Sequence, residues 1–159
     1  MLNIVCLAVM GLIFWKLSPV RGGYRNAGIC FLVVAGADLL VTLLFWETSH
    51  ASSMLITIPA AIVNYTGKYY EFNANSGVLI GVNKALSESW ITLWNWYLGS
   101  MLAVLGSLFF TILIPTLGLV LLVCTVVVSL LVEIAEPVLL YRSAKAFRAY
   151  SASAPALES

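Results

Sequence analysis

The chain has 159 residues, of which 62% are hydrophobic and 9% are charged. Soluble domains carry roughly one quarter charged residues, so this composition excludes an ordinary water-soluble protein. Eight basic residues against seven acidic ones give a formal net charge of +1, which excludes a global field that would attract nucleic acid. We therefore expect an all-α, polytopic helical integral membrane protein.

Two apolar segments near the N-terminus are predicted membrane helices. The first covers residues 2–17 and ends at Ser18-Pro19. Its basic residues follow the apolar run, whereas a signal peptide carries them in front, so we expect this segment to stay attached. The second covers residues 27–46, is interrupted only by Asp38, and places Trp46 where an interfacial aromatic is expected.

A third apolar segment, residues 51–66, contains Pro59 and is short for a membrane span, which takes roughly 20 apolar residues. It either crosses the membrane or forms a re-entrant segment. A polar connection is expected to follow, from Asn64 to Ser76.

From Ser89 to Val132 the chain has no charged residue. One helix over that run would be about 66 Å long, twice the hydrocarbon core of a bilayer, so the chain must turn back. Pro115 and Gly118 mark the turn, which predicts membrane helices over 90–114 and 116–136. The sequence thus predicts one helical domain over residues 1–150, with four membrane helices plus the short third segment.

The basic residues form two clusters, one at positions 16–25 and one at the C-terminal end of the chain. Lys and Arg are retained on the cytoplasmic side of short loops, so both clusters are expected on the cytoplasmic or matrix side. An even number of crossings must then separate them, which favours five crossings over four plus a re-entrant segment. A bacterial or organellar inner membrane is the expected location.

Three acidic residues are candidates for work inside the membrane. Asp38 needs a partner, because an ionisable group at the bilayer centre costs at least about 2.5 kcal/mol, and Thr42 lies one turn further on the same face. Asp38 is either a proton or cation site or a hydrogen-bonded group that holds helices together. Glu133 and Glu136 share one helix face before Pro137. They either pair with Arg142 or with a basic residue of a partner subunit, or they bind a cation or relay protons.

Two further features indicate contacts with other molecules. Gly99, Ala103 and Ser107 recur every four residues, which predicts a groove for close helix packing. Residues 138–150 form a predicted basic amphipathic segment that rests on an anionic membrane surface, docks on a partner or is an ordinary stop-transfer flank. Its basic residues are Arg142, Lys145 and Arg148. A polar tail is expected to follow at 151–159.

No catalytic, cofactor or metal motif is present in the sequence, and the single histidine, His50, excludes a haem held by two histidines of this chain. We therefore expect a non-catalytic accessory subunit of a larger membrane complex of the respiratory, ATP-synthase, secretion or conjugation type. Its expected partners are other membrane subunits and bound lipid, including anionic lipid. The alternative is a homo-oligomeric ion or proton channel, or a holin-like pore, that uses Asp38 or Glu133 and Glu136.

Overall fold

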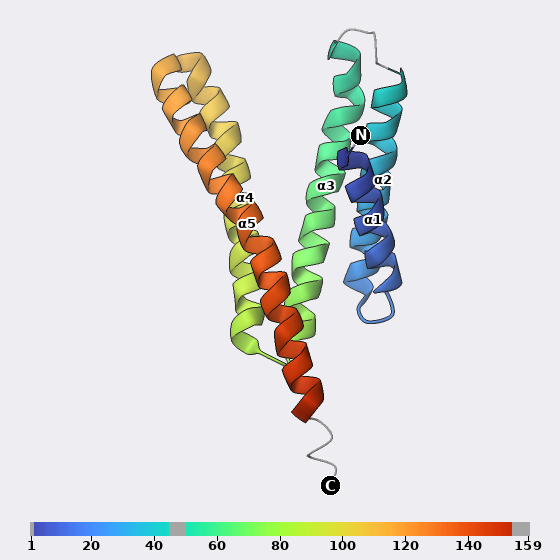
Figure 1. Ribbon diagram of the computed structural model, residues 1–159. Coiled ribbons are helices and arrows are strands. Elements are labelled where there is room, and N and C mark those ends of the chain that lie inside the picture. The colour runs from blue at the N-terminus through green and yellow to red at the C-terminus, as the bar shows by residue number, and fades with distance from the viewer. Residues whose placement is uncertain (1, 45–49, 154–159) are drawn as a thin grey trace. The chain divides into compact units, whose positions relative to one another are not determined.

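The computed structural model describes residues 2–44 and 50–153, and helices make up nearly all of these residues (Figure 1). The all-α prediction is confirmed. Residues 45 and 46 of the predicted second helix, with Trp46, and residues 154–159 of the predicted tail lie outside the described residues. The five helices are α1 (Leu2–Lys16), α2 (Gly22–Leu44), α3 (His50–Leu79), α4 (Lys84–Leu113) and α5 (Pro115–Ser153).

Three of these helices are long and apolar enough to cross a membrane: Gly22–Leu44, Lys84–Leu113 and Pro115–Ala152. Three of the four membrane helices predicted from the sequence are therefore supported. The difference is α1, an apolar helix of 15 residues. At about 1.5 Å per residue it is about 22 Å long, which is less than the hydrocarbon thickness of about 30 Å.

Two helices extend beyond their predicted ends. The segment from Asn64 to Ser76, expected to be a connection, is helical and belongs to the second half of α3. In the same way α5 continues through Pro137, so the expected basic segment 138–150 is the last part of one 39-residue helix. Proline removes one backbone N–H and crowds the preceding turn, but a helix in a membrane tolerates this when neighbouring groups compensate.

The chain divides into two compact units, Met1–Val78 and Leu79–Ser159. In the first unit α1 and α2 form an antiparallel hairpin, and α3 runs beside them (Figure 1). The hairpin turn lies at Ser18-Pro19, where the sequence places the end of the first helix.

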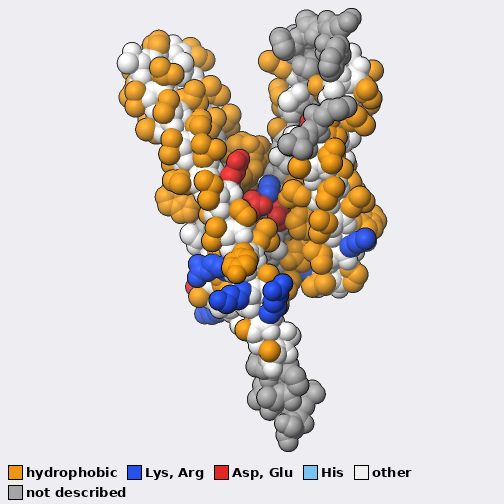
Figure 2. All heavy atoms as spheres, viewed as in Figure 1, with side chains coloured by type: hydrophobic (Ala, Val, Ile, Leu, Met, Phe, Trp, Pro, Cys, Tyr) orange, Lys and Arg blue, Asp and Glu red, His pale blue; other side chains and the backbone are white. Residues whose placement is uncertain are grey.

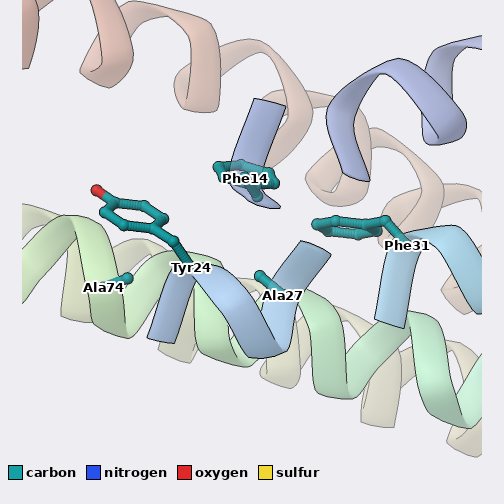
Figure 3. Close-up of a cluster of buried hydrophobic side chains, with 5 residues drawn as sticks. All are labelled: Phe14, Tyr24, Ala27, Phe31 and Ala74. Atoms are coloured by element: carbon teal, nitrogen blue, oxygen red, sulfur yellow. The ribbon is translucent and has the colours of Figure 1, made fainter. Parts of the chain in front are cut away.

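An aromatic cluster joins the three helices of the first unit (Figure 3). The ring of Phe14, from α1, lies 5.8 Å from that of Tyr24 and 5.7 Å from that of Phe31, both on α2. Ala27 and Ala74 complete the cluster from α2 and α3. Phe31 and Ala27 are fully buried, so this cluster is the packing centre of the unit.

Close backbone approach also holds α1 against α2. A Cβ atom added to Gly28 would lie 2.9 Å from the carbonyl oxygen of Gly11, and one added to Gly11 would lie 2.7 Å from Cγ of Leu32. Neither position has room for a side chain. The two glycines therefore let the helix backbones touch between the aromatic side chains.

The second unit is a long antiparallel hairpin of α4 and α5 (Figure 1). Asn83 caps α4, and its side-chain oxygen accepts a hydrogen bond of 3.1 Å from the backbone N–H of Leu86. The turn lies at Ile114, between Leu113 and Pro115, as the sequence predicts. At this turn a Cβ atom on Gly118 would overlap the backbone of Thr111, so only glycine fits.

The buried faces of α4 and α5 follow a seven-residue repeat. Such a period keeps one stripe of each helix against its partner when the two helices wind around each other with a left-handed twist. On α4 the repeat runs through Leu86, Leu93, Ser100 and Ser107. On α5 it includes the buried residues Gly118, Val132 and Leu139.

Candidate functional site

Asp38 lies on α2 and is half-buried. The amide nitrogen of Asn3, on α1, donates a long hydrogen bond of 3.4 Å to its carboxylate. Thr42, which the sequence places on the same face, donates at 2.8 Å to the backbone carbonyl of Asp38 and not to the carboxylate. The carboxylate therefore faces a neighbouring helix, and it lies about 9 Å along α2 from Leu44, the last described residue of that helix.

Asn3 is a partner that the sequence analysis missed. The signal was present, because Asn3 is a polar side chain inside the otherwise apolar run of the first helix. Intramembrane polar residues usually face other helices, and so two of them on adjacent helices are expected to meet.

Glu133 and Glu136 both lie within α5, with Glu133 exposed and Glu136 half-buried. Because α5 continues past Pro137 to Ser153, both carboxylates lie within the helix and not at its C-terminal end. The expected pairing with Arg142 is not seen, since Arg142 forms no ion pair with any described residue. In the described part of the chain no group of three or more His, Cys, Asp or Glu side chains is placed to hold a metal ion.

The predicted small-residue strip on α4 is divided between two faces. Ser107 is buried against α5, and its hydroxyl donates at 2.7 Å to the carbonyl of Val104. Gly99 and Ala103 are exposed, and a Cβ atom on Gly99 would meet no atom within 4 Å. The small residues that face α5 are Ser100 and Ser107, which follow the seven-residue repeat and not the expected spacing of four.

Gly99 and Ala103 line a hollow of about 360 Å³ on the side of the hairpin, called here the small-residue groove. Its walls come from both helices and are almost entirely apolar. Trp96, Ser100, Leu121, Cys124, Thr125 and Val128 complete the lining. The groove is open to the surroundings of the second unit.

Arg142 and Lys145 lie at a second hollow, where the beginning of α4 meets the last part of α5. Two adjoining spaces of about 500 and 610 Å³ share Ala85, Ser89 and Arg142, and together they form what is called here the seam groove. Arg148 does not line it. Figure 2 shows Lys and Arg side chains gathered over the last part of α5, with hydrophobic side chains covering the hairpin beyond them.

A set of buried polar groups in the first unit was missed at the sequence level. The ammonium group of Lys68 lies 3.1 Å from the carboxylate of Glu71 and 5.7 Å from the centre of the Phe31 ring. One turn further, the Tyr24 hydroxyl donates at 2.7 Å to the side-chain oxygen of Asn75. Lys68, Glu71 and Asn75 all lie on α3, in the segment that was expected to be a connection.

The spacing of these polar residues indicates a helix. Asn64, Lys68, Glu71 and Asn75 are separated by four, three and four positions, which places them on one face of a helix. An apolar stripe with that spacing predicts a helix, and a polar stripe with the same spacing is equally helical when it packs against polar partners.

Comparison with protein families, with curated proteins and with solved structures finds no match for this chain.

Proposed function

We propose that this chain is a non-catalytic accessory subunit of a larger membrane complex, of the respiratory, ATP-synthase, secretion or conjugation type, and that it contributes helix packing to the assembly. The small-residue groove carries this proposal. Its volume of about 360 Å³, its apolar walls and the open space above Gly99 fit an apolar helix from another subunit.

The physics of association in a membrane favours such a groove. Lipid tails are as apolar as Leu side chains, so helices associate through close packing and not through removal of apolar surface from water. Small residues allow that close packing. Trp96, 60% exposed at one end of the groove, offers a large flat surface to an incoming helix.

Co-purification in mild detergent tests the proposal. We expect the wild-type chain to bring a fixed set of other membrane proteins, and Gly99→Leu, which fills the groove, to lose them. Gly106→Leu is the matched control, since Gly106 lies on the same helix with open space around it and does not line the groove. Purification of the wild-type chain alone, or equal behaviour of the two variants, would contradict the proposal.

A homo-oligomeric channel or pore is the second candidate, favoured by Asp38. A carboxylate within an apolar helix that keeps partial exposure and bonds to Asn3 on the next helix is suited to bind a proton or cation. Conductance of the purified chain in planar bilayers that falls in Asp38→Asn would support this candidate. Conductance unchanged in that variant would remove the reason for it.

We further propose five crossings, with both basic clusters on the cytoplasmic or matrix side of an inner membrane. At about 1.5 Å per residue, the 30 residues of α3 extend about 45 Å, which is enough to cross. Single cysteines at Met54 and Gly81, in a background without the three native cysteines, test this. Labelling from opposite sides supports five crossings, and labelling from the same side supports four plus a re-entrant segment.

A further inference from the structure

The seam groove of the second unit has two chemically different ends. At one end it is lined by Arg142 and Lys145 of α5 together with the first turn of α4. At the other end most lining side chains are apolar, among them Trp96, Ile134 and Val138, and Glu88 and Thr92 lie on the α4 wall. A ligand that fits both ends has an anionic head and a long apolar tail.

The position of the basic end agrees with such a ligand. At the standard rise, Arg142 lies about 40 Å along α5 from Pro115, and Ile134 lies about 28 Å from it. The hydrocarbon core of a bilayer is about 30 Å thick, and about 40–45 Å with its headgroups. If Pro115 lies at one boundary of the core, Ile134 faces acyl chains and Arg142 faces the headgroups of the opposite leaflet.

The charges at the basic end are available to a ligand. Neither Arg142 nor Lys145 forms an ion pair with another described residue. The one carboxylate on the groove wall is that of Glu88, and Lys84 lies 3.9 Å from it. The groove therefore presents two uncompensated positive charges beside one acid that already has a basic neighbour.

We propose that the seam groove binds an anionic glycerophospholipid, with the phosphate at Arg142 and Lys145 and one acyl chain along Trp96, Ile134 and Val138. Phosphate accepts hydrogen bonds from guanidinium and ammonium groups, and the guanidinium of Arg142 can hold two of its oxygens. The apolar end distinguishes a lipid from free phosphate, which has no group to place there. This site goes beyond the proposed function and does not depend on it, because it lies within one unit of one chain.

Native mass spectrometry of the purified full chain tests the proposal. The protein is released from bilayers of phosphatidylcholine that contain phosphatidylglycerol as the minor lipid, and the lipid that remains bound is counted. We expect phosphatidylglycerol to be retained in preference to phosphatidylcholine. The double variant Arg142→Gln/Lys145→Gln should lose about thirty-fold in affinity for it, which corresponds to about 1 kcal/mol for each basic residue.

Arg148→Gln is the matched control, because Arg148 lies on the same helix surface but does not line the groove. It should retain the lipid. Arg142→Lys, which keeps the charge, should retain most of it, and Ala135→Phe, which fills the apolar end, should lower binding of the lipid without removing any charge. Soluble glycerol phosphate should not displace the lipid.

Three outcomes would overturn the proposal. One is equal loss in Arg148→Gln and in the double variant, which would indicate general surface attraction. Another is displacement by glycerol phosphate, which would indicate a phosphate site without a lipid tail. The third is a dimer in which a second copy covers the groove and excludes the lipid. Because Arg142 and Lys145 are exposed, their replacement leaves the packing of the hairpin intact, and circular dichroism checks this.

Discussion

The two units of this chain use different ways to hold helices together. In the first, 28% of the most apolar stretch of α2 is buried, and in the second the figure is 11% for both α4 and α5. The first unit packs three helices around an aromatic cluster. The second packs two helices along a single stripe and leaves most of their apolar surface exposed.

Polar groups differ in the same way. The first unit buries Glu71 and Asn75; Glu71 pairs with the half-buried Lys68, and Asn75 accepts a hydrogen bond from Tyr24 of α2. In the second unit the buried hydroxyls of Ser100 and Ser107 donate to carbonyls of their own helix. Buried polar contacts therefore gather in the first unit, whereas the second has a buried side-chain bond between its helices, from Trp90 to Ser143, and packs mainly by shape. The open apolar surface of the second unit is where other molecules are expected.

The largest expected loss of stability comes from breaking the ion pair of the first unit. Lys68→Gln removes the ammonium group that lies 3.1 Å from the carboxylate of Glu71, which is 1% exposed. Removal of one partner of a buried pair costs about 3–5 kcal/mol, so unfolding in sodium dodecyl sulfate, followed by far-UV circular dichroism, should occur at a much lower detergent fraction.

The second unit supplies the control, because Lys84 and Glu88 form an exposed pair at 3.9 Å. Lys84→Gln should change stability by less than about 0.5 kcal/mol. The double variant Lys68→Gln/Glu71→Gln should recover part of the loss, since the buried carboxylate charge is then removed together with the ammonium charge. Equal losses of stability in Lys68→Gln and Lys84→Gln would show that burial does not make the first ion pair more important for stability than the second.

A smaller effect is expected at the turn of the second unit. Gly118→Val places a branched side chain on the backbone of Thr111, and overpacking of this kind costs about 1–3 kcal/mol. Gly106→Val has open space around it and should be close to neutral. The same detergent titration compares the two, and equal stability would mean that close approach at the turn is not required.

The smallest effect concerns the polar bond between α4 and α5. The indole N–H of Trp90 donates at 3.1 Å to the hydroxyl of Ser143, and both residues are buried. A double-mutant cycle of Trp90→Phe and Ser143→Ala should give a coupling energy of about 1 kcal/mol. Simple additivity of the two variants would show that shape alone holds this end of the hairpin.

Much of the helical arrangement was predictable from the sequence. The lengths of the apolar runs predicted the helices α1, α2 and α4. The uncharged run that begins at Ser89 is too long for one membrane helix, and this predicted the turn that the structure places at Ile114. The errors came from residues that usually end helices. Polar residues suggested a connection after Asn64, but the segment is helical, and Tyr24 of α2 donates a hydrogen bond to Asn75 within it. Pro137 suggested an end to α5, but it lies on an exposed face of a continuous helix.

The candidate sites were predictable only as residue types. Asp38 was expected to face a neighbouring helix, and Asn3 is the side chain that meets it. The sequence places the small residues on one helix, as the structure does. The spacing of four did not predict which of them face α5, because the buried residues of α4 follow a repeat of seven. The seam groove was not predictable, since it depends on which part of α5 lies beside the first turns of α4.

The hydroxyls along the α4–α5 stripe bond within their own helices. Thr111, Thr125 and Ser129 also donate to carbonyls of their own helices. These three hydroxyls, like those of Ser100 and Ser107, donate within their own helix and not across to the other one. The bond from Trp90 to Ser143 and the close backbone contact at Gly118 thus lie toward the two ends of the hairpin, and the small-residue groove lies between them, where the helices meet mainly through side-chain shape.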